Sequence, residues 1–148
     1  LPTLAFRFFN VFGPLQAAGH AYAAVIPAFL EAALAGRRLP IQGDGLQTRD
    51  FTFVESVADL LCRAATQQVT NDVPVNLAFG SRRTLLDVIS EIERQLGRPL
   101  SREFVAPRPG DVRDSQADST QLRELFPDVD PFPFEDGLRR TIEWMRRQ

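Results

Sequence analysis

The chain has 148 residues, of which 44% are hydrophobic and 24% charged, and its formal net charge at pH 7 is −2. This length favours a single domain, and no apolar run approaches the roughly 20 residues that a membrane helix needs. The net charge excludes the overall basic field that nucleic-acid binding usually requires. We therefore expect neither a membrane protein nor a nucleic-acid-binding protein.

Several residue types are too scarce for common kinds of chemistry. The sequence has no lysine, which excludes Schiff-base catalysis and a Tyr–Lys catalytic pair within these residues. The single cysteine, Cys62, can build neither an internal disulfide nor a thiolate metal site, which favours the cytoplasm. No cluster has the spacing of metal ligands, so we predict no metal. The start at Leu1 has neither an initiator Met nor a signal-peptide pattern, and it predicts a chain cut from a longer protein.

The first third of the chain predicts a strand followed by a helix. Residues 3–13 form a nearly continuous apolar run that ends at Gly13, the pattern of a parallel strand buried on both faces. Apolar residues then recur at helical spacing, with Pro27 suited to a first turn and Gly36 to a C-terminal cap. These signals predict a helix over about residues 26–35.

The middle of the chain continues this alternation. Residues 39–42 and 50–54 are short strand-like segments joined by a Gly-rich turn. Ser56 and Asp59 form a capping signal, and a helical stripe of apolar residues follows. Strand and helix therefore alternate again.

A third strand and helix follow. Residues 73–80 predict a strand and a turn, and Thr84 with Asp87 predicts the capped start of a helix that stops at Gly97.

The last third is less regular. Residues 98–133 are rich in Pro and Asp, with one short helix expected after Asp118, and a final helix is expected near residues 135–147. The alternation predicts an α/β fold, but the opening strand, Gly-rich turn and helix of a dinucleotide-binding fold are missing.

Three polar clusters are candidates for ligand binding. The first is Asn10, directly after the predicted strand, where an open α/β sheet binds its ligands. The alternative is a turn Asn that bonds to its own backbone. The second is residues 43–51, in which a Gly-rich turn and Arg49 could surround a phosphate. The alternative is a hairpin loop with an exposed Arg49–Asp50 pair.

The third cluster is residues 108–118, which place two arginines and a small hydroxyl on a rigid loop suited to an anion. The alternative is a solvated charged linker. None of the three clusters is a self-contained catalytic set, and we assign no catalytic residue.

In this order, the motifs resemble the extended short-chain dehydrogenase/reductase family, and in particular its nucleotide-sugar 4-epimerases. The matching stretches are residues 6–14 (FRFFNVFGP), 22–27 (YAAVIP), 43–51 (GDGLQTRDF) and 108–118 (RPGDVRDSQAD). The resemblance implies the C-terminal part of an extended Rossmann-type fold, with the last parallel strands and a small mixed α/β substrate-binding subdomain. Residues 1–148 would then be a single partial domain that lacks the NAD-binding half.

The resemblance also implies roles for individual residues. Asn10 is similar to the family's amide near the substrate diphosphate, and Arg49 and Arg108 are similar to two arginines that hold the diphosphate and ribose. Phe8 and Phe9 resemble the segment beside the nicotinamide of NAD.

Three further positions complete the substrate site implied by the resemblance. Ala24 and Val25 would contribute backbone contacts at a helix entrance. Ile41, which precedes Gln42, would also belong to the substrate-binding residues.

Two departures from the family's pattern bear on the substrate. Gln42 stands where many relatives place an aromatic ring under uracil, so hydrogen bonds or apolar contacts would hold the base instead. Ser115 stands where some epimerases of simple hexoses carry a bulky Tyr, and its small side chain leaves room for an N-acetylated sugar.

The implied activity is that of a UDP-sugar 4-epimerase acting on UDP-GlcNAc/UDP-GalNAc or UDP-glucose/UDP-galactose with NAD. The family's Gly-rich NAD turn and Tyr-x-x-x-Lys pair are missing here, so we expect this chain alone to be inactive. The alternatives are a sugar-nucleotide decarboxylase or dehydratase of the same superfamily and a non-catalytic binding fragment. The full-length protein could form a homodimer, and the sequence leaves this question open.

Overall fold

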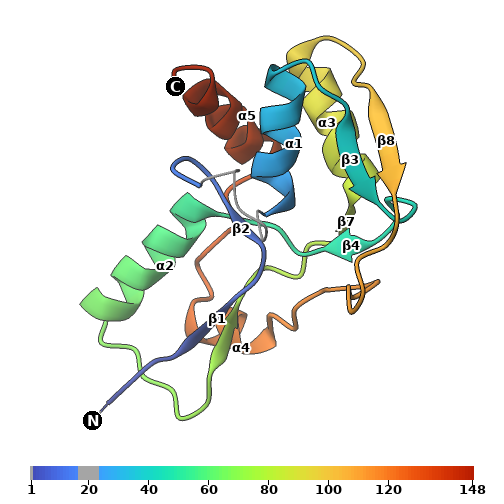
Figure 1. The fold of residues 1–148 in the computed structure, drawn as a ribbon. Coiled ribbons are helices and arrows are strands. Elements are labelled where there is room, and N and C mark those ends of the chain that lie inside the picture. Colours follow the sequence, from blue (N-terminus) through green and yellow to red (C-terminus); the bar gives the residue numbers. More distant parts are fainter. Residues whose placement is uncertain (1, 17–23) are drawn as a thin grey trace.

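The computed structural model describes residues 2–16 and 24–148 as a mixed α/β arrangement (Figure 1). In chain order the elements are β1 (Phe6–Phe8), β2 (Val11–Phe12), α1 (Val25–Leu34), β3 (Leu39–Gln42), β4 (Thr48–Arg49), β5 (Thr52–Phe53), α2 (Val54–Thr66), β6 (Val75–Leu77), β7 (Arg83–Thr84), α3 (Leu85–Leu96), β8 (Arg102–Val105), α4 (Thr120–Leu125) and α5 (Phe134–Met145). The pairs β1–β6, β2–β5 and β3–β8 are parallel, and β4–β7 is antiparallel. Parallel pairing with intervening helices confirms the predicted α/β class.

The predicted first strand is wrong in two respects. Residues 3–13 form two short strands, β1 and β2, and the break lies at Asn10, whose φ of 30° departs from extended backbone. The run is not buried on both faces either, because Arg7 and Phe8 are exposed. Within the described part of the chain β1 has β6 as its sole partner, so its other edge is uncovered.

The predicted start of α2 is also wrong. The helix begins at Val54, two residues before Ser56, and the N-cap residue Phe53 makes no side-chain capping bond. Ser56 lies inside the helix, where its buried Oγ accepts a 2.9 Å hydrogen bond from the amide of Phe132. A residue type that favours helix caps serves here as a tertiary contact between α2 and the segment before α5.

The start of α3 is as predicted. The Thr84 hydroxyl accepts a 3.0 Å bond from the Asp87 amide, and the Asp87 carboxylate accepts a 2.8 Å bond from the Thr84 amide. Gly97, with φ of 69°, ends the helix in the left-handed conformation that glycine adopts at least cost. Helices α1, α4 and α5 also confirm the predicted ones within one or two residues at their ends.

Strand β8 was missed within the segment predicted to be irregular. It runs parallel to β3, with Leu39 opposite Arg102 and Ile41 opposite Phe104. All four β8 residues are exposed, so the strand has no alternation of buried and exposed residues to indicate it.

Two clusters of buried side chains hold the fold together. One joins α1, α3 and α5 with β3 and β5, and the other lies where α2 and α4 flank the β1–β6 pair (Figure 1). Helix α5 approaches β5 closely at Gly137, where a Cβ atom would lie 2.7 Å from the Phe53 ring. No helix among the described residues is long and apolar enough to cross a membrane.

Candidate functional site

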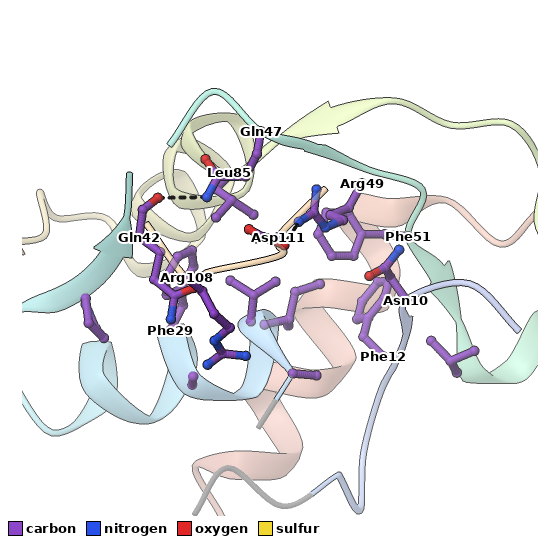
Figure 2. Close-up of a pocket in the computed structure, with 16 residues that line it drawn as sticks. Asn10, Phe12, Phe29, Gln42, Gln47, Arg49, Phe51, Leu85, Arg108 and Asp111 are labelled. Carbon is purple, nitrogen blue, oxygen red and sulfur yellow. Dashed lines mark hydrogen bonds and ion pairs between the residues drawn. The ribbon is translucent and has the colours of Figure 1, made fainter. Parts of the chain in front are cut away.

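A cavity of about 390 Å³ opens between the start of α1, the end of β3 and the β4–β5 segment, a size typical of small-molecule sites. Figure 2 shows Arg49 and Asn10 on one side of it and Gln42 and Arg108 on the other. The lining includes most of the predicted substrate-binding residues, namely Asn10, Ala24, Val25, Gln42, Arg49 and Arg108. The structure therefore brings together residues from all three polar clusters.

The first turn of α1 forms one wall of the cavity. Ala24 is the N-cap residue and offers no side-chain capping bond, and the first turn contains no acidic residue. A helix N-terminus carries unpaired N–H groups and a partial positive charge, which favour an anion. Backbone contacts from Ala24 and Val25 are consistent with this geometry.

Arg49 is held rigidly at the cavity wall. Its Nη1 donates 2.7 Å hydrogen bonds to the carbonyls of Thr48 and Val112, and its Nη2 forms an ion pair with Asp111. Only 14% of its side chain is exposed. Such a network fixes the guanidinium plane before a ligand arrives, and the planar group remains suited to a phosphate.

Arg108 differs from Arg49 in its surroundings. It is exposed and forms no ion pair with any residue that the structure describes. In Figure 2 its side chain extends toward α1 from the opposite wall. With Arg49 already paired to Asp111, Arg108 carries the net positive charge of the cavity.

Gln42 is kept in place by a buried neighbour that the sequence did not indicate. The Gln47 amide donates a 2.7 Å hydrogen bond to the Gln42 carbonyl, and both residues line the cavity (Figure 2). The bond joins the end of β3 to the residue before β4, and both ends of the bond belong to the cavity wall.

Asn10 is not a turn residue bonded to its own backbone. Its Nδ2 donates a 3.3 Å hydrogen bond to the carbonyl of Asp50, 40 residues further along the chain. The bond ties the turn after β1 to the β4–β5 segment beside Arg49. The alternative interpretation of Asn10 as a purely local turn residue is therefore excluded.

The hairpin alternative for residues 43–51 is also excluded. Strand β4 pairs with β7 and β3 pairs with β8, so no hairpin joins β3 to the next strand. No exposed Arg49–Asp50 pair exists, because Asp50 is fully buried and Arg49 pairs with Asp111.

Residues 108–118 are docked against β4, so they are not a free linker. The Thr48 amide donates to the Arg113 carbonyl at 2.9 Å, and the Thr48 hydroxyl donates to Asp114 at 2.9 Å. Arg113 forms an ion pair with Asp44 at 2.8 Å. The hydrogen bond from Arg113 lowers the pKa of Asp44, and the bonds from Thr48 and then Arg82 lower that of Asp114.

Several predicted site residues do not line the cavity. The Ile41 side chain is fully buried in the core, and the Ser115 amide donates a 3.2 Å bond to the Thr48 carbonyl outside the cavity. Phe8 and Phe9 lie at and after the end of β1, away from the cavity lining. Their roles stay predictions. Tyr22, part of another matching stretch, lies outside the described residues.

Metal ligands do not gather in the described structure. Among residues 2–16 and 24–148, no group of three or more His, Cys, Asp or Glu side chains lies close enough to hold a metal ion. The cavity instead combines amide, guanidinium and backbone donors, which suit an anionic organic ligand.

Known proteins have similar sequences, and a solved structure has a similar fold. The pattern of the NAD dependent epimerase/dehydratase family matches residues 1–78. A UDP-glucose 4-epimerase of Mycolicibacterium smegmatis is 35% identical over 139 residues, which are 94% of this chain and 44% of that protein. A UDP-N-acetyl-alpha-D-glucosaminuronate decarboxylase of Bacillus cytotoxicus is 33% identical over 153 residues, covering 99% of this chain and 47% of that protein.

A solved structure of a UDP-N-acetylglucosamine 4-epimerase from Methanobrevibacter ruminantium superimposes with a TM-score of 0.91 and 35% identity. The match covers 99% of this chain and 47% of that one. The chain thus spans about half the length of the relatives that it matches. The fold is that of the C-terminal part of a Rossmann-type epimerase, and the relatives include both epimerases and decarboxylases.

Proposed function

The chain belongs to the NAD-dependent epimerase/dehydratase family, and we propose that it is the substrate-binding portion of a UDP-sugar 4-epimerase. Its substrates are UDP-GlcNAc and UDP-GalNAc, or UDP-glucose and UDP-galactose. The observation that carries the proposal is the convergence of Asn10, Arg49 and Arg108 on one cavity at the start of α1.

The charges of the cavity suit a nucleotide diphosphate. Arg49 presents a fixed guanidinium, Arg108 brings an exposed one from the opposite wall, and the start of α1 adds a partial positive charge. Only Asp111 among the lining residues is acidic. Bidentate arginine and helix N-termini are the recurring protein partners of phosphate groups. Asn10 supplies an amide on the same side as Arg49.

The two ends of the substrate would meet different residues. Gln42 lies on the lining in the position where the family's aromatic ring stacks on uracil, and it holds the base through its polar side chain instead. The sugar extends past the cavity toward Ser115, which lies next to Thr48, and the small side chain there leaves space for an N-acetyl group at C2.

The described residues do not form a cradle for NAD. No strand, Gly-rich turn and helix of the dinucleotide-binding kind follow one another within them. We propose that the NAD-binding half, with the family's Tyr–Lys pair, belongs to a longer protein and meets this chain near Phe8 and Phe9. This chain alone is then inactive, since hydride acceptance and proton transfer both need groups that it lacks.

The experiment is an assay of the full-length gene product with NAD on UDP-glucose, UDP-GlcNAc and UDP-glucuronate. Inversion at C4 of UDP-glucose or UDP-GlcNAc is expected. A second candidate, a sugar-nucleotide decarboxylase, is favoured by the 33% identity to the Bacillus cytotoxicus enzyme, and release of CO₂ from UDP-glucuronate without C4 inversion would support it instead. Turnover by the 148-residue chain alone would contradict the proposed division of the protein.

A further inference from the structure

Asp50 is a buried acidic residue between Arg49 and Phe51, which both line the cavity, and its side chain has no basic partner among the described residues. Its exposed fraction is 0%. One carboxylate oxygen accepts bonds from the Ser81 amide at 3.1 Å and the Ser81 hydroxyl at 2.8 Å. The other accepts bonds from the amides of Gly80 at 3.0 Å and Ala117 at 3.2 Å. A buried carboxyl group is tolerated when hydrogen bonds replace those of water, and here four do so.

The four bonds come from two segments distant in sequence. Gly80 and Ser81 lie in the loop before β7, and Ala117 ends the docked segment that begins at Arg108. The Asp50 main-chain carbonyl accepts the bond from Asn10, on a third segment. One residue therefore joins three loops, and each of them borders the cavity or leads to a residue that lines it.

The bond to Ala117 matters for Arg108, because both residues belong to the segment that docks against β4. Residues 101–114 are all exposed, so no hydrophobic burial fixes this part of the chain. The side-chain contacts that dock it through Asp44, Thr48 and Arg49 are partly or fully open to solvent, whereas the Asp50–Ala117 bond is buried. Water competes with exposed hydrogen bonds and screens exposed ion pairs, so the buried bond is, beside the two main-chain bonds at buried Thr48, a firm polar anchor of the segment.

We propose that Asp50 is a positioning residue for the diphosphate site. It does not touch the substrate. It holds the end of the segment that brings Arg108 to the opposite wall. The role in binding rests on the proposed function, whereas the anchoring of residues 108–117 does not.

The test is Asp50→Asn, which keeps the shape of the side chain. Each carboxylate oxygen accepts two bonds, so either orientation of the Asn amide sets its NH₂ against at least one backbone N–H. Ser56→Ala is the matched control, because it removes a buried polar contact between two residues that do not line the cavity. Ser81→Ala removes one bond to Asp50 and serves if Asp50→Asn fails to fold.

The first measurement is amide hydrogen exchange without ligand. Asp50→Asn, or Ser81→Ala to a smaller degree, should speed exchange of the Thr48, Ser115 and Ala117 amides by about tenfold, since local opening governs exchange. Ser56→Ala should leave these amides unchanged. Unchanged exchange in Asp50→Asn and Ser81→Ala would overturn the proposal, whether or not the chain binds UDP.

The second measurement is a double-mutant cycle of UDP affinity. Asp50→Asn should weaken UDP binding by about tenfold in the wild-type background and by less than about twofold in the Arg108→Gln background. Additive losses would show that Asp50 acts through general stability and would overturn its positioning role. Absence of UDP binding by the wild-type chain would instead contradict the proposed function. The exchange measurement would then still show whether Asp50 anchors residues 108–117.

Discussion

The guanidinium of Arg49 donates a 2.7 Å hydrogen bond to the main-chain carbonyl of Val112, 63 residues further along the chain. This bond, with those to Thr48 and Asp111, makes one side chain the meeting point of two of the three polar clusters. The cavity wall is therefore assembled before any ligand binds, and rigid donors lose less free energy on binding than mobile ones.

Arg49→Lys tests whether the planar guanidinium matters. Lysine keeps the positive charge but lacks the planar fork of N–H donors, so it cannot bond to Thr48, Val112, Asp111 and a phosphate at once. UDP affinity should therefore fall by about tenfold. Calorimetric titration measures the effect. Arg37→Lys is the control, since exposed Arg37 pairs with Glu31 and does not line the cavity, and it should leave UDP affinity unchanged. Equal affinity of Arg49→Lys and the wild type would contradict a role for the guanidinium plane.

Arg108→Gln tests the positive charge of Arg108, which no described residue neutralises. The variant should bind UDP about tenfold more weakly or worse. Because one phosphate contact is lost, added salt should also reduce the UDP affinity of the variant less steeply than that of the wild type. Binding of uridine, which has no phosphate, should not change. Arg102→Gln, on β8, removes a charge paired to Glu93 and is the control. A parallel loss of uridine and UDP affinity would show that Arg108 does not contact phosphate.

Gln42→Tyr tests how the base is held. Gln42 is half-buried on the lining, and an aromatic ring there would stack on uracil. UDP should bind about fivefold more tightly, a gain of about 1 kcal/mol, within the range for a stacked base. Competition titrations against inorganic pyrophosphate separate the base from the phosphates, and pyrophosphate affinity should stay constant. Weaker UDP binding by Gln42→Tyr would place the base elsewhere.

Local features of the fold could be predicted from the sequence, whereas contacts between distant residues could not. The cap of α3 was predictable because Thr84, Asp87 and Gly97 act through local hydrogen bonds and backbone conformation. The gathering of Asn10, Arg49 and Arg108 followed from the family resemblance, since side chains so distant in sequence leave no local pattern. The burial of Asp50 was missed, because its partners Gly80, Ser81 and Ala117 contribute mainly backbone amides, which every residue type shares.

Strand positions were less predictable for a related reason. Strand β1 is mostly apolar in sequence although Phe8 is exposed, and the exposed strand β8 has no buried side to give it a period of two. Ser56 is of a residue type that favours helix caps, but at its position inside α2 it bonds to the amide of Phe132 instead. In each of these cases the packing partners decide the outcome, and they lie far away in sequence.

Gly137→Ala should destabilise the fold by about 1–3 kcal/mol, because the added methyl group would overlap the Phe53 ring at 2.7 Å. The helix propensity of alanine would otherwise favour the change. Urea unfolding measures the loss. Phe53→Leu in the same chain makes room and should recover part of it. An unchanged or increased stability of Gly137→Ala would contradict the close approach of α5 to β5.

Low pH should weaken the docking of residues 108–118 against β4. The pKa values of Asp44 and Asp114 are lowered from the ordinary value of 3.8 by hydrogen bonds to Arg113 and Thr48 respectively. A lowered folded-state pKa contributes stability that is fully present above pH 3.8 and is lost as the pH falls through the folded-state value. Hydrogen exchange of the Thr48 and Ser115 amides, corrected for intrinsic rates, should therefore show weaker protection below pH 3.8 than at pH 5. Asp114→Asn should weaken this dependence, and equal protection at both pH values would contradict it.

The most direct test of the diphosphate site is an NMR titration of the 148-residue chain with UDP, following backbone amide shifts. We expect saturable shifts at the amides of Val25, Gln42, Arg49 and Arg108, and smaller shifts from uridine at the same concentrations. Arg108→Gln should raise the UDP concentration needed for saturation. Shifts confined to residues of α3 and α5 outside the cavity, such as Arg94 and Arg139, or no saturable shift at any amide around the cavity, would contradict binding of the nucleotide diphosphate by this chain.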